Sequence, residues 1–360
     1  MSTPVYHGSE AAKLMTAVVG SRNIEASVLA TLVVISACGP MSLPTTPTAT
    51  AARIDTNDRR IVQRLPVDVP GQEPWRAVEI DPYVYVVTHG IQTGDGAVVH
   101  IDSRTAGAAG RVLRLDFAPG EVAYGFGSLW VAHARGDAPI VRIDLATLRV
   151  TASVQGAHFM GPGVTTALGF VWSANLDPYA PPGPGSGSVS RIDPATNAIT
   201  LTIPSGPSPL AIAAGEHQLW TANHGNETIS WIDVDRTVVT TETASEGIHN
   251  VIWGGGYVWA ASYHTHAILR IDPGTRKTID RTALPFAPLA LAILRDRLYV
   301  ASAGIGVGTE THGRIAAIRL ADASVEEILD IGPRIAGLTV AGDRLLAICG
   351  APAIIVEVRL

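Results

Sequence analysis

The chain has little cysteine, little charge and few aromatic residues. Among its 360 residues are two cysteines, 16% charged residues and 6% aromatic residues. With only two cysteines, the chain cannot build the disulfide framework of a small secreted domain. The formal net charge is −6, and no run of Lys or Arg interrupts that balance. This composition argues against a surface for nucleic acid or for anionic lipid.

Common catalytic signatures and membrane-spanning segments are also missing from the sequence. It contains no glycine-rich phosphate loop, no nucleophile elbow and no Cys/His zinc spacing. The apolar stretch from Ala26 to Pro40 is too short to cross a bilayer as a helix. Its length is that of the hydrophobic region of a signal peptide.

The start of the chain predicts export. "ISAC" ends the apolar stretch and resembles the bacterial lipobox, so Cys38 is the candidate lipidation site and residues 1–37 the signal peptide, with Met15 as an alternative start. Residues 38–52 are rich in Pro, Thr and Ala and predict a flexible tether. The expected location is the cell envelope outside the cytoplasm, on a membrane through the lipid alone. An ordinary secretory signal or an N-terminal helix is the alternative.

A repeat organises the rest of the chain. Its most regular part is an apolar strand, which occurs as "VYVVTH", "LWVAH", "VWSAN", "LWTAN", "VWAAS", "LYVAS" and "LLAIC", starting at Val84, Leu129, Val171, Leu219, Val258, Leu298 and Leu345. Successive copies are about 43 residues apart, a period typical of a β-propeller with one four-stranded blade per repeat. Helical periodicity is absent from the repeats, which predicts an all-β fold.

Each repeat contains the same further elements. The two ends of the repeat region predict how the ring closes. A later strand ends in an Ile-Asp pair, as in "IVRID" and "AILRID", before a turn whose backbone N–H groups the Asp can bind. The last repeat stops after its third strand, and a strand within residues 52–67 can replace the missing one. Residues 53–360 are therefore predicted to form one seven-bladed β-propeller of four-stranded antiparallel blades, closed by an N-terminal strand that completes the last blade.

The histidines are distributed unevenly in such a ring. Loops between the second and third strands of a blade, and loops that lead to the next blade, open on one face, called here the top face. Eight of the eleven histidines fall there: His89, His133, His158, His224, His249, His264, His266 and His312. The other three are His7, His100 and His217.

Polar residues are also expected at the mouth of the central channel. The residue that ends each repeated strand is expected to point towards the axis, which gives His89, His133, Asn175 and Asn223, and the first strands add Glu121, Asn250 and Arg334. Convergent polar groups are typical of a ligand site. The predicted binding residues are His89, His133, Asn175, Asn223, His224, His249, Asn250, Tyr263, His264 and Arg334. A solvated loop surface with no binding role is the alternative.

A metal site is open at His264 and His266. On a strand these two side chains would share one face, which suits zinc. No carboxylate or cysteine lies within a few residues of them. No motif requires a cofactor, and the binding of a divalent metal ion is left open by the sequence. Cys349 is expected to be a buried, inert thiol.

The repeated strands and the "RID-PxT" turn resemble those of YVTN/YncE-type and streptogramin-lyase-like propellers. This superfamily includes the virginiamycin B lyases, which use a His general base in the motif "P-H-x-I" and a magnesium ion held by Glu. The resemblance therefore implies a similar site here. Here "IHNVI" places His249 at the base position, with Ile248 where Pro is expected. Glu is absent from the ends of the repeated strands, where Mg²⁺ would need carboxylate oxygens.

Three functional hypotheses remain open from the sequence. The first is a monomeric propeller that binds a small molecule, peptide or protein at its top face. The second is a lyase-like enzyme with His249 as general base, assisted by His133 or His264. The third is an envelope scaffold without a small-molecule site. The first is favoured over the enzyme because the metal half of the lyase motif is missing.

Overall fold

The computed structural model describes residues 60–90, 93–104, 110–134, 139–154, 163–176, 187–236, 238–243, 247–302 and 312–360. Across these ranges the regular backbone is β-strand throughout. None of the described segments contains a helix long and apolar enough to cross a membrane. The predicted signal peptide, the tether, Cys38 and His158 lie outside the described residues.

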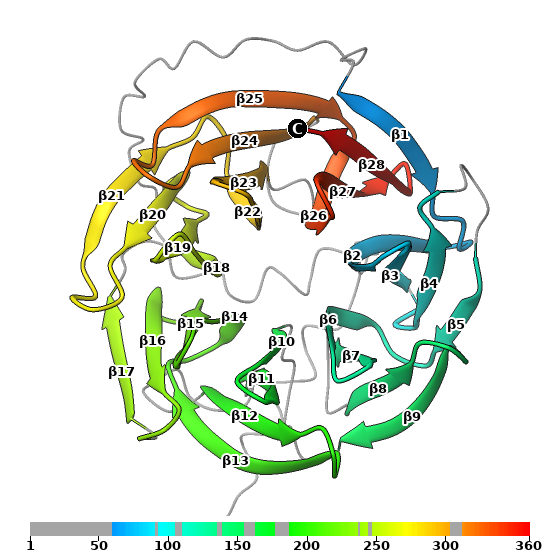
Figure 1. The fold of residues 1–360 in the computed structure, drawn as a ribbon, viewed down its shortest axis with the longest axis horizontal. Coiled ribbons are helices and arrows are strands. Elements are labelled where there is room, and N and C mark those ends of the chain that lie inside the picture. The colour runs from blue at the N-terminus through cyan, green and yellow to red at the C-terminus, as the bar shows by residue number, and fades with distance from the viewer. Residues whose placement is uncertain are drawn as a thin grey trace, which may run out of the picture. The chain divides into compact units, whose positions relative to one another are not determined.

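Seven four-stranded antiparallel sheets form a ring (Figure 1). In each sheet the strands follow one another in sequence from the inner edge outwards, except in the sheet that contains both ends of the described chain. The prediction of a seven-bladed β-propeller is thereby confirmed. We number the blades 1 to 7 in chain order.

Every blade is built from short strands. Blade 1 contains β2 (Gln72–Ile80), β3 (Tyr83–Gly90), β4 (Gly96–Asp102) and β5 (Val112–Leu115). Blade 2 contains β6 (Pro119–Gly125), β7 (Ser128–His133), β8 (Ile140–Asp144) and β9 (Arg149–Val154). Blade 3 contains β10 (Val164–Ala167), β11 (Phe170–Leu176), β12 (Gly187–Asp193) and β13 (Ala198–Ser205). Blade 4 contains β14 (Pro209–Ala214), β15 (Gln218–Asn223), β16 (Thr228–Asp233) and β17 (Val238–Thr243).

The remaining blades follow the same plan. Blade 5 contains β18 (Ile248–Gly254), β19 (Tyr257–Ser262), β20 (Ala267–Ile271) and β21 (Thr278–Ala283). Blade 6 contains β22 (Pro288–Leu294), β23 (Arg297–Ser302), β24 (Gly313–Arg319) and β25 (Val325–Gly332). Blade 7 contains β26 (Arg334–Ala341), β27 (Arg344–Ala351), β28 (Ile354–Arg359) and β1 (Ile61–Pro66).

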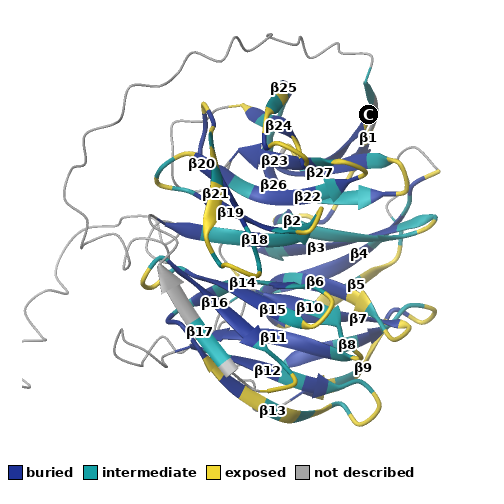
Figure 2. Ribbon diagram, turned by 60° about the vertical axis from the view of Figure 1, so that its left-hand side comes forward, coloured by how far each residue is buried: buried dark blue, intermediate teal, exposed yellow. Residues whose placement is uncertain are grey.

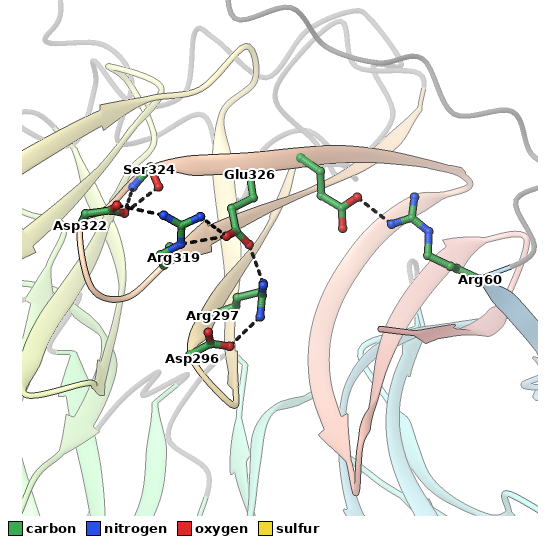
Figure 3. A network of polar contacts seen from close by, with 8 residues as sticks. Arg60, Asp296, Arg297, Arg319, Asp322, Ser324 and Glu326 are labelled. Atoms are coloured by element: carbon green, nitrogen blue, oxygen red, sulfur yellow. Dashed lines mark hydrogen bonds and ion pairs between the residues drawn. The ribbon is translucent and has the colours of Figure 1, made fainter.

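The N-terminal strand closes the ring as predicted. β1 pairs antiparallel with β28, and Leu65, which is fully buried, packs in one cluster with residues of blades 1 and 7. Arg60, just before β1, donates to Glu327 on β25 of blade 6 over 2.6 Å (Figure 3). Because β1 pairs with the outer edge of β28, that edge of β28 is not exposed for pairing with a strand of another chain.

The core lies between neighbouring blades. Trp130, Trp172, Trp220 and Trp259 are the largest fully buried side chains. Trp259 of blade 5, for example, belongs to one cluster with Leu298 and Ile318 of blade 6. These tryptophans therefore pack between blades. Outer strands such as β13 and β21 alternate between exposed and partly buried residues (Figure 2), as expected for a sheet edge with one face in water.

The Asp residues of the "RID" turns cap those turns, as the sequence predicts. Asp144 Oδ1 accepts bonds from the backbone N–H and the hydroxyl of Thr147, over 2.8 and 2.6 Å. Asp272 binds Thr275 in the same way, over 2.6 and 2.9 Å. These bonds to Thr147 and Thr275 lower the pKa of each carboxyl group because they favour its charged form.

Candidate functional site

Three histidines and one tyrosine come together where blades 4 and 5 meet on the top face. His224 follows β15, His249 is the second residue of β18, and Tyr263 and His264 follow β19. Ring centroids lie 4.3 Å apart for His224 and His249, 6.2 Å for His249 and His264, and 4.9 Å for His249 and Tyr263. We call His224, His249, Tyr263 and His264 the imidazole cluster.

Backbone geometry fixes the position of His249. Ile248 and Asn250 pair with Ser262 and Ala261, which are consecutive, so His249 is the extra residue of a β-bulge. The same bulge occurs in β2, β14 and β22, where the preceding residue is proline: Pro74, Pro209 and Pro288. A bulge re-aims one side chain out of the regular alternation of a strand. In blade 5 that side chain is an imidazole.

The turn after β19 reaches back to the start of β18. The N–H of Tyr263 donates to the carbonyl of Gly247 over 2.9 Å. Gly247 has φ of 73°, and a Cβ added there would lie 2.2 Å from Cδ2 of His264. Glycine is therefore needed at 247 both for its backbone angle and for the close approach of the His264 ring.

Burial disfavours positive charge on two histidines of the cluster, His224 and His249. Burial lowers the pKa of His249 to about 3, and the neighbouring His224 and His264 act in the same direction. Burial also lowers the pKa of His224, with His264 adding to the shift and Glu227 opposing it. His249 is therefore neutral at physiological pH and carries one N–H donor and one nitrogen acceptor.

Two ring nitrogens of this cluster have unused hydrogen-bonding capacity. Nε2 of His249 and Nδ1 of His224 are buried, and neither has a hydrogen-bond partner in the described part of the chain. A buried polar atom without a partner costs free energy, and such atoms in native proteins point to a water, ion or ligand. The arrangement can thus bind a neutral group that offers a donor and an acceptor.

Asn175 and Asn223 correct the sequence prediction. Nδ2 of Asn223 donates to the hydroxyls of Thr228 and Ser230, over 3.0 and 2.8 Å, and Oδ1 accepts from Thr221 over 2.9 Å. Asn175 makes the corresponding bonds to Ser173, Ser188 and Ser190. The expectation that these amides point to the axis is wrong, because sheet faces in a propeller look towards neighbouring blades and only the inner edge looks into the channel.

His89 and His133 lie in blades 1 and 2, and each ring packs against an aromatic ring, that of Trp75 in blade 1 and that of Phe117 in the connection between the two blades. His133 is 6% exposed and stacks on Phe117, with ring centroids 3.6 Å apart. His89 is half-buried, and its ring centroid lies 5.1 Å from that of Trp75. His133 is thus a packed side chain within its blade rather than a group that points to the axis.

Asn250 and Arg334 lie on inner strands, as expected. Nδ2 of Asn250 donates to the carbonyl of Leu289 in blade 6 over 3.0 Å, so it links two neighbouring blades. Arg334 begins β26, and its charge opposes the rise in the pKa of Glu73 that burial causes.

The pair His264 and His266 does not share a strand face. Residues 263–266 form a turn between the paired Ser262 and Ala267, and His266 has φ of 51°. The expectation of one common face fails because strand alternation stops at Ser262. Across the described ranges, no group of three or more His, Cys, Asp or Glu side chains is placed to hold a metal ion.

A charged pair in the channel was only half anticipated. Arg76 of β2 binds Glu121 of β6 and donates to the carbonyl of Ala336 in β26, so it joins the inner strands of blades 7, 1 and 2. Burial raises the pKa of Glu121 while Arg76 opposes the rise. The sequence contains a signal that could have identified Arg76. Arg76 lies two residues after Pro74, and Glu121 lies two residues after Pro119, so they hold equivalent positions in neighbouring blades.

Burial explains the state of Cys349. Its thiol is 0% exposed, and burial raises its pKa to about 12. A thiol that stays protonated is a poor nucleophile, in line with the expectation of an inert cysteine.

Comparisons with known proteins support the fold. No protein-family model matches the chain, and no curated protein matches it in sequence. Among solved structures, the WD40 β-propeller domain of Doa1 is 11% identical, with a TM-score of 0.62, over 83% of this chain and 96% of that one. A chain of the mitotic checkpoint complex is 12% identical, with a TM-score of 0.67, over 90% and 98%.

A third solved structure extends the comparison. Kuenenia stuttgartiensis hydrazine synthase is 13% identical, with a TM-score of 0.63, over 81% of this chain and 96% of that one. At these identities the likeness shows the propeller fold alone. The seven-bladed fold that the resemblance to YVTN/YncE-type and lyase-like propellers implies is therefore supported, whereas no family model and no curated protein supports membership of those families.

Proposed function

We propose that this propeller is a binding module that recognises a neutral polar group of a peptide or protein partner at the imidazole cluster. The observation that carries the proposal is the pair of buried nitrogens, Nε2 of His249 and Nδ1 of His224, that no described residue satisfies. A backbone amide of a peptide offers the donor and the acceptor that two neutral imidazoles need. Tyr263 and His264 supply aromatic surface beside them.

Binding fits the cluster better than catalysis. An efficient general base has a pKa near the working pH, whereas the pKa of His249 is about 3. In the described part of the chain, no carboxylate hydrogen bond orients the His249 ring, and such a bond is common for a catalytic histidine. A chain of the mitotic checkpoint complex, a multiprotein assembly, has the same fold, which is compatible with a protein partner.

Selection of peptide ligands tests the proposal. A library of random linear peptides is selected against the wild-type protein, and the enriched peptides are synthesised and titrated by calorimetry. Loss of one buried hydrogen bond costs about 1–3 kcal/mol, so His249→Leu should weaken binding by roughly fivefold or more. The matched control is His312→Leu, because His312 is exposed just before β24 in blade 6 and belongs neither to the imidazole cluster nor to its neighbouring strands. That variant should bind within about twofold of wild type, well below the effect of one hydrogen bond.

Two results would contradict the binding function. Peptides that bind His249→Leu as tightly as wild type would remove the imidazole cluster from the interface. Consumption of the bound ligand, detected by mass spectrometry and abolished in His249→Ala, would favour the enzyme instead.

We infer from the sequence that the module acts outside the cytoplasm on a lipid anchor. The support is the apolar stretch that ends in "ISAC" and the Pro/Thr-rich segment after it. In a bacterial host, labelled fatty acid should be incorporated into the wild-type chain and not into Cys38→Ser. Equal labelling of both, or no labelling of either, would refute the anchor without affecting the binding proposal.

A further inference from the structure

Three blades carry an arginine directly opposite the buried tryptophan of the second strand. Trp130 pairs with Arg142 in blade 2, Trp172 with Arg191 in blade 3, and Trp259 with Arg270 in blade 5. Each guanidinium lies over an aromatic ring of its own blade, at 4.5 Å from the ring centroid of Phe170 for Arg191. The three arginines are therefore structural equivalents, and their other contacts can be compared.

Two of these arginines connect their blade to the next one. Nη1 of Arg142 donates to the carbonyl of Pro194 over 2.7 Å and to Oδ1 of Asn197 over 3.0 Å, both in blade 3. Nη1 of Arg270 donates to the carbonyls of Leu320 and Ala321 in blade 6, over 2.9 and 2.6 Å. In both cases the acceptors belong to the turn between the third and fourth strands of the next blade.

Arg191 lacks this connection. Its Nε donates to the hydroxyl of Thr200 in its own blade over 3.0 Å. Its Nη1 and Nη2 make no hydrogen bond or ion pair with any residue in the described ranges. The corresponding turn of blade 4, which contains Val234 and Asp235, instead forms one wall of a cavity that Arg191 lines.

This cavity has a volume of about 230 Å³ and lies at the opposite end of the blades from the imidazole cluster. Its apolar lining consists of Leu168, Phe170, Trp172 and Val234, and its polar lining of Arg191, His217 and Asp235. Asp235 is exposed and forms no ion pair with Arg191. The cavity thus combines an aromatic and aliphatic floor with a guanidinium whose terminal N–H groups are unused.

A tight turn forms part of the cavity wall. Leu168 and Gly169 form the two-residue turn between β10 and β11, with φ of 54° and 79°. Such a turn favours Asn or Gly, and a leucine there costs free energy. The same turn occurs in blade 2 at Phe126 and Gly127, with φ of 54° and 70°, and in blade 3 it places the side chain of Leu168 in the cavity wall.

We propose that the cavity binds a carboxylate attached to an apolar group. A carboxylate can accept two parallel bonds from Nη1 and Nη2 of Arg191, while the apolar group contacts Phe170 and Trp172. Pockets for drug-sized ligands measure roughly 300–1,000 Å³, so this cavity suits a single small acid or the last residue of a peptide. Asp235 at the rim disfavours a second negative charge on the ligand.

The experiment compares an acid with its amide. The probes are 3-phenylpropanoate, 3-phenylpropanamide and an acetylated tripeptide that ends in phenylalanine with a free carboxylate. The reporter is the indole N–H resonance of Trp172, assigned with Trp172→Phe in the full chain labelled with ¹⁵N-tryptophan. The indole of Trp172 donates to the carbonyl of Ala167 over 3.0 Å and stays in place in this fold.

The acid should shift this resonance in a saturable way and bind at least about tenfold more tightly than the amide, because only the acid forms a charge-assisted pair. Arg191→Gln should remove the difference between acid and amide, and Arg191→Lys should retain part of it. Arg149→Gln is the control, since Arg149 is exposed on β9. Tighter binding of the tripeptide than of the free acid would identify a peptide C-terminus as the source of the carboxylate. Exclusion of the tripeptide would identify a small acid.

Three outcomes would overturn the proposal. They are equal binding of acid and amide to the wild type, no saturable shift with either, and an unchanged acid affinity in Arg191→Gln. The first two need only the wild-type protein, so they do not depend on how well a variant folds.

Discussion

The side-chain amide of Asn223 makes three hydrogen bonds, all to residues of blade 4. The ring of His249, in contrast, has a buried nitrogen without a hydrogen-bond partner among the described residues. Both residues are polar, and both lie at the top end of their blades. The difference follows from their strands, because Asn223 ends a second strand and His249 occupies a bulge of an inner strand. At the residue scale, the satisfied amide of Asn223 marks a structural side chain, and the unused nitrogen of His249, whose ring adjoins that of His224, marks a candidate for binding.

Substitution of Asn223 tests this distinction. Asn223→Ala removes the acceptor of Thr221 and the donor to Thr228 and Ser230 in a site with no exposure. The free energy of unfolding should fall by about 2–3 kcal/mol, measured by urea denaturation. Glu216→Ala, at an exposed position in the turn between β14 and β15 of the same blade, should cost about 0.5 kcal/mol or less. Equal losses in the two variants would refute the structural role of the Asn223 amide.

At the scale of a single element, the type of turn determines which residues have a strained backbone. Phe126 and Gly127 form the turn between β6 and β7 with φ of 54° and 70°, and Phe126 is 44% exposed. Asn-Gly is the preferred sequence for such a turn, because both residues adopt positive φ at little cost. The phenyl ring therefore occupies a backbone position that other residues would fill more favourably.

Phe126→Asn should increase the free energy of unfolding by about 0.5–1 kcal/mol, since the strain at positive φ is relieved. Phe126→Val should decrease it, because a β-branched residue tolerates positive φ least. Chemical denaturation of the three proteins side by side measures both changes. A loss of stability in Phe126→Asn would mean that the packing of the phenyl ring outweighs the backbone strain.

The sequence was informative about elements and less so about side-chain directions. The repeated Trp strands and the Asp-capped turns predicted the blades, because burial and turn chemistry are local properties. The bulge at His249 was not predicted, since β-bulges have no fixed sequence signature beyond the proline that Ile248 replaces here. The direction of Asn175 and Asn223 was predicted wrongly for a different reason, because side chains of a second strand face the neighbouring blades and not the channel.

Ring closure brings distant parts of the whole molecule together. Leu65 of β1 packs with Val84 of blade 1 and Ile348 of blade 7, although these residues are far apart in sequence. The sequence predicted this closure because the last repeat lacks one strand. It could not predict the cavity beside Arg191, because that cavity depends on how the turn of blade 4 lies relative to blade 3.

Leu65→Ala tests the closure. Truncation of this fully buried side chain should reduce the free energy of unfolding by about 2–5 kcal/mol. Arg64→Ala should change it by about 0.5 kcal/mol or less, because Arg64 is exposed on the same strand. Urea denaturation of both variants provides the measurement. A small effect of Leu65→Ala would show that β1 contributes little to the ring.

The most direct test of the imidazole cluster is a pH titration of the histidine rings by ¹H–¹⁵N NMR. Since the pKa of His249 is lowered in the folded protein, the unfolded chain binds more protons, and stability falls as pH drops from about 6.5 towards 3. We predict that His249 remains neutral at pH 4.5 while the protein stays folded. A charged His249 ring in the folded protein at pH 5.5 would contradict the buried, neutral imidazole on which the proposed binding function rests.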